Sequence, residues 1–179
     1  MFAKTKWTAQ MVHKYHDLPV HKVIPSLDHE TYYPNQTDLT IKLTKSFSSS
    51  SSNSVINILA MIRPRTPRRN PEFTLDLVLK LAYEFGNNTV INLFGAIPDD
   101  IMKTRDKLEK LKGSNLAPYH SKEFMTSAKN IKMLGIVLER VEIADLYRKT
   151  DVFIDLSWWQ AFGRAGVEAM ACGVVAIMV

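Results

Sequence analysis

Short apolar runs alternate with amphipathic segments along most of this chain. The apolar runs predict strands over residues 55–62, 89–94, 131–134, 151–156 and 174–179. Between them, apolar positions at helical spacing predict helices over residues 73–85, 99–111, 122–129, 143–149 and 165–171, with 114–120 as loop. Because strands and helices alternate, we expect an α/β fold, a Rossmann-like parallel sheet with helices on both faces.

The first 54 residues show a less regular pattern. A helix is expected near residues 8–15, and a short strand over 20–25 is stopped by Pro25. Residues 26–34 form a polar and aromatic connection. The tract SFSSSSSNS at 46–54 can bury almost nothing, so we expect a flexible surface loop there.

Parallel strands bring their carboxyl ends to one edge of a sheet, where ligands bind. The loops that follow the predicted strands are residues 63–71, 95–99, 135–141 and 157–164. The last apolar run continues to the end of the chain. We therefore expect the domain to be incomplete at its C-terminus, because an uncovered apolar edge strand promotes association.

Composition and charge narrow the function only slightly. With 179 residues, 46% of them hydrophobic, the chain can form one domain with a core. The net charge of +5 favours an anionic partner, whether a nucleotide, a nucleic acid or a membrane surface. Cys172 is the single cysteine, so no internal disulfide can form. We predict neither a signal peptide nor a membrane span, and a cytoplasmic location follows as the default.

The segment from Ser157 to Gly173 combines the strongest chemical signals. It follows a predicted strand and opens a helix, whose free N–H groups and positive dipole end suit a phosphate. Gly163 and Gly166 would let the backbone approach a ligand closely. Glu168 lies one turn into the helix, where its carboxylate can accept the two hydroxyl hydrogens of a ribose. The alternative is a glycine- and alanine-rich helix start without a ligand.

A second segment, MIRPRTPRRNP at residues 61–71, is rich in arginine. Guanidinium groups held at this edge would stabilise the negative charge that develops on a leaving diphosphate. A solvated basic turn or a nucleic-acid-binding patch is the alternative for this segment taken alone. His13 and His16 lack a second pair of ligands, so no metal site is expected.

The pattern SxxxxFGxxxxEAMACG over residues 157–173 resembles the signature of retaining family-4 glycosyltransferases, which have the two-domain GT-B fold. Two glutamates of that signature flank the Phe-Gly pair. Glu168 matches the second, which the resemblance assigns to the ribose. Gln160 stands at the first, which contacts the donor sugar; its neutral amide can still hydrogen-bond a hydroxyl. The resemblance adds these residues to the nucleotide site: Phe162, Gly163, Gly166 and Val167.

The resemblance extends to other segments. Arg63 matches the arginine of the family's Gly-Arg pair, and Arg68 stands where a diphosphate-binding lysine is usual. The form RPxTPRR is similar to a subgroup that includes rhamnosyltransferases of surface polysaccharides. Residues 23–34 resemble the hinge that leads into the C-terminal domain. In the passage from residue 131 to 157, the resemblance implies that the base packs against Gly135 and Val137.

The resemblance implies that residues 20–179 are the donor-binding domain and that residues 1–19 are a remnant of the preceding region. Transfer would proceed with retention and without a metal, from a dTDP-, UDP- or GDP-sugar to a glycan acceptor. Arg63, Arg68 and Gln160 would be catalytic. The partner would be a missing N-terminal domain or a separate chain, in the cytoplasm or at the inner face of the membrane. This chain alone is expected to be inactive.

Two other functions remain open at this point. The chain is alternatively a non-catalytic fragment, or a subunit of a split glycosyltransferase. A basic nucleic-acid-binding module using the arginines of residues 63–69 is the third hypothesis, although no nucleic-acid-binding fold signature accompanies them, and we predict no nucleic-acid partner.

Overall fold

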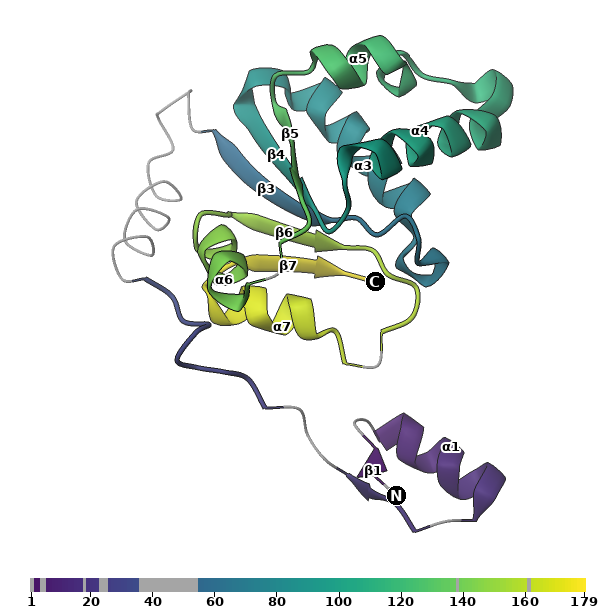
Figure 1. Cartoon of the computed structure of the whole chain (residues 1–179), viewed down its shortest axis with the longest axis vertical. Coiled ribbons are helices and arrows are strands. Elements are labelled where there is room, and N and C mark those ends of the chain that lie inside the picture. The colour runs from purple at the N-terminus through teal and green to yellow at the C-terminus, as the bar shows by residue number, and fades with distance from the viewer. Residues whose placement is uncertain are drawn as a thin grey trace.

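A parallel β-sheet forms the centre of the molecule (Figure 1). The computed structural model describes residues 2–3, 6–17, 19–22, 26–35, 55–137, 139–160 and 162–179. Within them the main sheet has five strands in the order β5-β4-β3-β6-β7. The strands are β3 (Ile56–Met61), β4 (Thr89–Phe94), β5 (Ile131–Gly135), β6 (Val152–Asp155) and β7 (Val175–Met178). Every neighbouring pair is parallel, so the predicted α/β fold is confirmed.

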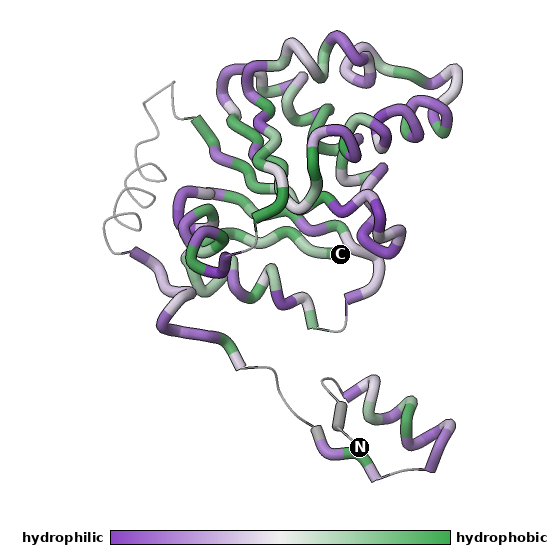
Figure 2. The backbone as a smooth tube through the Cα atoms, in the orientation of Figure 1, coloured by the Kyte–Doolittle hydropathy of each residue, from purple (hydrophilic) through white to green (hydrophobic). Residues whose placement is uncertain are grey.

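Helices cover both faces of this sheet. Because side chains alternate between the faces along each strand, each strand contributes to both cores. Ile58 and Ala60 of β3 face a core formed with α3 (Pro71–Phe85), α4 (Pro98–Lys112) and α5 (Lys122–Ser127). Leu59 and Met61 face the other core, formed with α6 (Arg140–Arg148) and α7 (Arg164–Ala171). The central strands are accordingly hydrophobic, whereas α4 at the periphery is largely hydrophilic (Figure 2).

The strand order creates a switch point next to β3. The chain moves outward from β3 to β4 and β5, then returns to the other side of β3 with β6 and β7. The connections after β3 and β6 therefore diverge to opposite faces, and a crevice opens between them at the carboxyl ends of the strands. These connections, residues 62–70 and 156–163, carry the two motifs singled out in the sequence.

Most predicted elements are present with shifted ends. The strand over residues 89–94 has the predicted bounds, and α6 begins at Arg140 rather than at residue 143. The stretch 114–120, expected to be loop, contains the 3-10 turn Pro118–His120, and the neighbouring 3-10 turn Gly113–Asn115 overlaps its start. The sequence pattern does not reveal the turn at Pro118–His120, because it depends on a side-chain hydrogen bond. The Nδ1 atom of His120 accepts this bond from the Ala117 N–H (2.9 Å). The serine tract at 46–54 lies outside the described residues.

The segment before the sheet contributes to one of the cores. Helix α1 (Lys6–His16) and the short parallel strands β1 (Phe2–Ala3) and β2 (His21–Lys22) come first, and residues 23–25 of the predicted strand lie outside the described residues. Tyr32, in the connection that follows, is 2% exposed and packs in the core shared by α6 and α7. No helix in the described part of the chain is long and apolar enough to cross a bilayer.

Candidate functional site

The two motif loops meet at the switch point and are bonded to one another. The Trp158 N–H donates to the carbonyl oxygen of Arg68 at 3.0 Å. Nη1 of Arg69 lies 3.1 Å from Oδ2 of Asp155 and donates a hydrogen bond to Oγ of Ser157 at 3.1 Å. The arginine-rich loop after β3 and the loop that leads into α7 therefore form one continuous surface at the carboxyl edge of the sheet.

The arginines of this surface differ in what surrounds them. Arg65 forms an ion pair with Asp100 (2.9 Å), and Arg69 is half-buried against Asp155. Burial lowers the pKa of Arg69; Asp155 opposes this effect, and the positive charges of Arg63 and Arg68 add to it. The side chains of Arg63 and Arg68, which the sequence predicted to hold the diphosphate, are exposed.

A cavity of about 390 Å³ lies beside this surface, at the ends of β3, β4 and β5. Its lining includes Arg63, Arg65, Ile97, Asp100, Ile136 and Val137. Val137 was predicted to contact a base, and it lines the cavity. Gly135, predicted alongside it, ends β5, and its carbonyl oxygen accepts from the Gly95 N–H (2.8 Å) at the edge of this cavity. The lining thus combines apolar residues with two arginines and an aspartate.

The start of α7 adjoins the same edge. Gly163 precedes the helix in a left-handed conformation (φ 67°), which glycine adopts without strain. The first N–H groups of an α-helix have no partner within the helix, so they are available to an anion. Gln160 is half-buried, and a Cβ atom placed on Gly163 would lie 3.5 Å from its Oε1 atom. Phe162 is 38% exposed.

Gly166 and Val167 lie in the first turns of α7. A Cβ atom on Gly166 would lie 1.9 Å from Sδ of Met178, so the small residue here makes room for the side chain of strand β7. This contact is a packing reason for the glycine, in addition to the close ligand approach predicted from the sequence. Val167 is half-buried, and its N–H donates to the Gly163 carbonyl (3.1 Å).

Glu168 is a buried carboxylate at this site, with 8% of its surface exposed. Nε of Arg164 donates a hydrogen bond to its Oε1 atom at 2.8 Å. Burial raises the pKa of Glu168, and the hydrogen bond and charge of Arg164 offset the rise in part; the Tyr32 hydroxyl contributes a further hydrogen bond that lowers it. A carboxylate so placed can accept hydrogen bonds from hydroxyl groups through its second oxygen.

Sequence reasoning missed the groups that support these residues. Asp155 was hidden inside an apolar run, and Tyr32 lies in a connection far away in sequence. Asp155 could have been singled out, because a carboxylate at the end of a buried strand requires a partner. No comparable local signal pointed from Tyr32 to Glu168.

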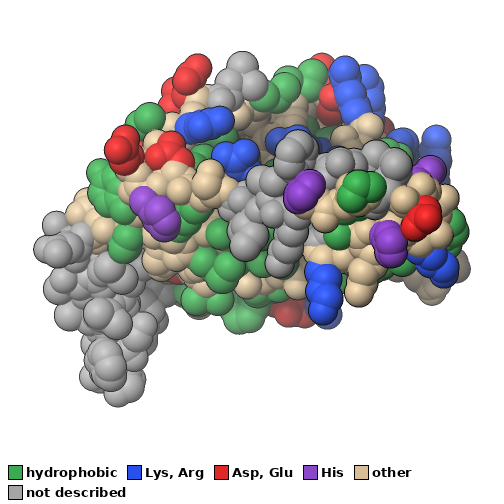
Figure 3. Space-filling model, turned by 90° about the horizontal axis from the view of Figure 1, so that it is seen from below, with side chains coloured by type: hydrophobic (Ala, Val, Ile, Leu, Met, Phe, Trp, Pro, Cys, Tyr) green, Lys and Arg blue, Asp and Glu red, His purple; other side chains and the backbone are tan. Residues whose placement is uncertain are grey.

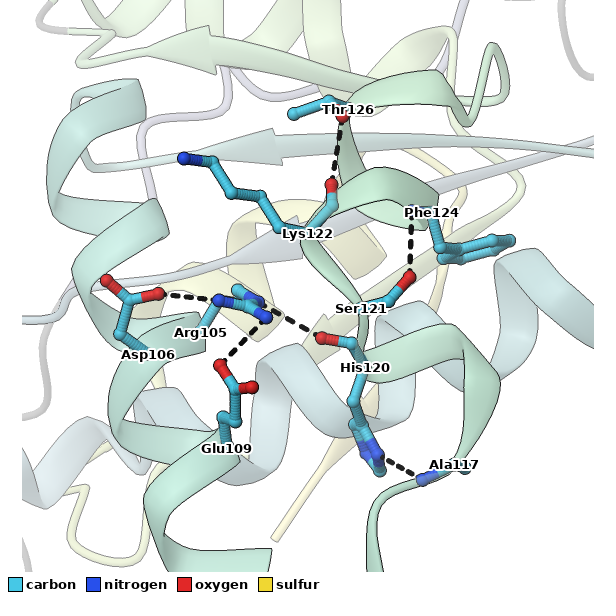
Figure 4. Close-up of polar contacts among 9 residues, drawn as sticks. All are labelled: Arg105, Asp106, Glu109, Ala117, His120, Ser121, Lys122, Phe124 and Thr126. Carbon is cyan, nitrogen blue, oxygen red and sulfur yellow. Dashed lines mark hydrogen bonds and ion pairs between the residues drawn. The ribbon is translucent and has the colours of Figure 1, made fainter.

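A second polar cluster lies away from this edge, between α4 and α5 (Figure 4). Arg105 donates to the His120 carbonyl oxygen (3.0 Å) and pairs with Asp106 (2.7 Å) and Glu109 (2.8 Å), beside a cavity of about 360 Å³. Because this guanidinium already has partners on three sides, we assign the cluster a structural role. Among the described residues, no group of three or more His, Cys, Asp or Glu side chains is placed to hold a metal ion.

The charged surface is mixed on the face drawn in Figure 3. Lysine and arginine side chains are interspersed there with acidic and hydrophobic ones. A continuous basic stripe would be expected on a face that follows a nucleic-acid backbone. This face does not have one among its described residues.

Comparisons with known proteins agree with this fold. HepE of Anabaena, solved with UDP and glucose, superimposes with a TM-score of 0.61 at 15% identity over 99% of this chain and 43% of HepE. Sucrose-phosphate synthase of Thermosynechococcus elongatus gives a TM-score of 0.65 at 16% identity over 99% of this chain and 39% of that one. The C-terminal domain of LpcC, a glycosyl transferase group 1 family protein of Francisella tularensis, gives 0.54 at 19% identity, with 86% and 70% covered.

The chain thus spans about two fifths of the length of HepE. These likenesses confirm the Rossmann-like half of a GT-B fold, whereas the similarity to a rhamnosyltransferase-like subgroup stays a prediction. Comparison with curated protein sequences gave no match. The family model described as "Glycosyl transferases group 1" matches residues 57–179, which is more than half of the chain. The chain therefore belongs to the glycosyl transferases group 1 family.

Proposed function

We propose that this chain binds a nucleoside-diphosphate sugar at the switch point and supplies the donor-binding part of a retaining glycosyltransferase. One observation carries the proposal: the exposed Arg63 and Arg68 lie on a loop bonded to the loop that leads into α7, one turn before the buried Glu168. Two cations, a helix N-terminus and a carboxylate at one edge suit a ligand that joins a diphosphate to a ribose.

The ligand would extend along this edge. The diphosphate would contact Arg63, Arg68 and the first N–H groups of α7, and the ribose hydroxyls would bind Glu168. The base would occupy the cavity of about 390 Å³ against Val137. The crystal structure of HepE with UDP and glucose supports a ligand of this class.

The chemistry would depend on charge at the leaving group. When the bond between the sugar and the diphosphate breaks, negative charge grows on the phosphate oxygens. Fixed guanidinium groups and helix N–H groups stabilise that charge more in the transition state than in the bound donor, and this difference lowers the barrier. Gln160 would hydrogen-bond a hydroxyl of the donor sugar, and the same guanidinium groups would make a metal ion unnecessary. The sugar would then pass to a glycan acceptor.

Calorimetry on the whole chain tests the proposal. UDP, dTDP and GDP, each with and without a sugar, should include at least one ligand that binds, and its diphosphate should bind more tightly than its nucleoside. Glu168→Ala should weaken both, because it removes the ribose contact, and Lys129→Ala, an exposed change remote from the edge, should weaken neither. A folded sample that binds no member of the panel contradicts the proposal.

A further inference from the structure

Asp155 is a buried carboxylate with a complete set of partners. It is the last residue of β6 and only 1% exposed. Burying an ionised carboxylate is costly unless it is paired and hydrogen-bonded. Its Oδ2 atom lies 3.1 Å from Nη1 of Arg69. Its Oδ1 atom accepts from the Ser157 N–H at 3.2 Å and from the Ser157 hydroxyl. Both oxygens are therefore directed at neighbouring loop residues.

These contacts belong to a larger arrangement, which we name the loop clasp: Arg68, Arg69, Asp155, Ser157 and Trp158. Within it, Arg69 also donates to the Ser157 hydroxyl (3.1 Å), and the Trp158 N–H donates to the Arg68 carbonyl (3.0 Å). The clasp joins the loop after β3 to the loop after β6. One loop carries the exposed arginines, and the other leads through Gln160 to the start of α7.

The clasp also opposes an electrostatic strain. Arg63, Arg68 and Arg69 belong to one short loop, and the charges of Arg63 and Arg68 act on Arg69. Like charges so close repel one another, and the repulsion tends to open the loop. The carboxylate of Asp155, held at the end of a sheet strand, opposes this tendency at Arg69, as Asp100 does at Arg65.

We propose that Asp155 is a positioning residue, which holds the arginine loop against the loop after β6 through Arg69 so that Arg63 and Arg68 face the diphosphate. The inference rests on the proposed function, and it adds a residue that does not contact the donor. Affinity for diphosphate should depend on Asp155 because a loop that opens must be closed again before both arginines can reach the ligand.

The test compares Asp155→Asn with a matched change, Asp151→Asn, in the whole chain. Asp151 precedes the other end of β6 and accepts from the Asn57 N–H at 2.8 Å, so it also bonds to the strand region while lying away from the site. Two quantities are measured for each: the affinity for UDP, dTDP and GDP, and the hydrogen-exchange rate of the Trp158 amide, which reports on the clasp without any ligand.

We expect Asp155→Asn to weaken diphosphate binding about ten-fold and to speed exchange of the Trp158 amide, because a charge-assisted bond within a shared network is lost. Asp151→Asn should change neither. Unchanged exchange in Asp155→Asn, unchanged diphosphate affinity, or an equal loss in both variants each overturns the inference. If the wild type binds no nucleotide, the proposed function fails, and the exchange rate alone decides whether the clasp exists.

A second variant covers the case in which Asp155→Asn does not fold. Replacing the pair together, Arg69→Met with Asp155→Leu, removes both charges, so that neither is left buried without its partner. This double variant should fold and should show the same faster Trp158 exchange and weaker diphosphate binding. A folded double variant with wild-type exchange and affinity overturns the inference.

Discussion

At the scale of a single residue, the exposed Arg68 allows recognition of the phosphates to be tested separately from recognition of the nucleoside. We expect Arg68→Ala to weaken binding of a nucleoside diphosphate by about 1.5–3 kcal/mol, because a charge-assisted hydrogen bond is lost. Binding of the corresponding nucleoside should change little. Calorimetry with both ligands measures the difference, and Lys107→Ala, an exposed change on α4, is the control.

Equal weakening of both ligands would show that Arg68 does not contact the phosphate. The same variant also tests the nucleic-acid hypothesis. Tight, salt-sensitive binding of DNA or RNA that Arg68→Ala abolishes would favour it over the nucleotide-sugar site.

The ionised carboxylate of Glu168 should favour nucleotide binding but lower the stability of the folded chain at pH 7. Burial raises its pKa above the usual value, so the folded chain holds the proton more strongly than the unfolded chain does. Its contribution to stability therefore declines as pH rises through the unfolded and then the folded pKa. Glu168→Gln should raise the melting temperature at pH 7 and weaken nucleotide binding, and the gain in melting temperature should vanish below about pH 4.

Thermal melts of the two proteins between pH 4 and pH 8 measure this effect. The result contradicts the account if Glu168→Gln is less stable than the wild type at pH 7, because the hydrogen bond from Arg164 would then outweigh the cost of burial.

A motif in the sequence can name candidate site residues, but it cannot show the tertiary contacts that surround each of them. Arg63, Arg68 and Glu168 stand in recognisable patterns, and the structure brings their loops together at one edge. The separation of Arg69, half-buried against Asp155, from its exposed neighbours depends on a strand 86 residues away in sequence. Nothing in the order of the arginines could have revealed it.

Tyr32 is the buried aromatic side chain in the connection before the sheet. Tyr32 packs against Tyr147 of α6 (ring centroids 6.3 Å apart), and Nη1 of Arg148 donates to the Thr31 carbonyl oxygen (3.1 Å). We expect Tyr32→Ala to cost about 3–5 kcal/mol of unfolding free energy, as for other large buried aromatic residues. Tyr32→Phe keeps the ring and should cost about 1 kcal/mol or less.

Urea denaturation of both variants measures these costs. Tyr15→Ala is the matched control, because Tyr15 lies on α1 with 68% of its surface exposed. Similar costs for Tyr32→Ala and Tyr15→Ala would mean that the connection does not dock on α6 in solution.

The half-buried Asp76 links α3 to the last residue of α4 and to the turn before α5. Nε2 of His120 lies 2.6 Å from Oδ1 of Asp76, and Nζ of Lys112 lies 2.8 Å from Oδ2. Burial alone would raise the pKa of Asp76, but the hydrogen bonds from His120 and Lys112 outweigh it and hold the pKa below its usual value. Ionised Asp76 therefore stabilises the fold above its unfolded pKa of about 4, and this contribution is lost as pH falls through the folded pKa.

Asp76→Asn should thus cost about 1–3 kcal/mol at pH 7, and its difference from the wild type should shrink as the solution is acidified. Denaturation at a series of pH values checks this, with Glu84→Gln as the control, since Glu84 forms an exposed pair with Lys80 that contributes little. A cost that does not vary with pH would rule out the ionised carboxylate as its source.

Elements were predictable because hydrophobic periodicity decides them. The alternation along β3, with Ile58 toward one core and Leu59 toward the other, is the pattern of a strand buried on both faces. The start of α6 was missed because residues 140–142 are exposed and supply no apolar repeat. Helix ends of this kind depend on backbone hydrogen bonds rather than on hydrophobic pattern.

At the scale of the whole molecule, we expect this chain to bind a donor without transferring its sugar. The motif residues in the described part of the chain lie at the proposed donor site. The similarity to HepE covers about two fifths of that protein. Transfer requires a donor and an acceptor held together, and that positioning is worth orders of magnitude in rate. The assay follows release of nucleoside diphosphate by purified, monodisperse chain with several nucleotide sugars and glycan acceptors. Release should stay at background and be unaffected by Glu168→Ala. Turnover well above background that Glu168→Ala abolishes would show that this chain suffices for catalysis.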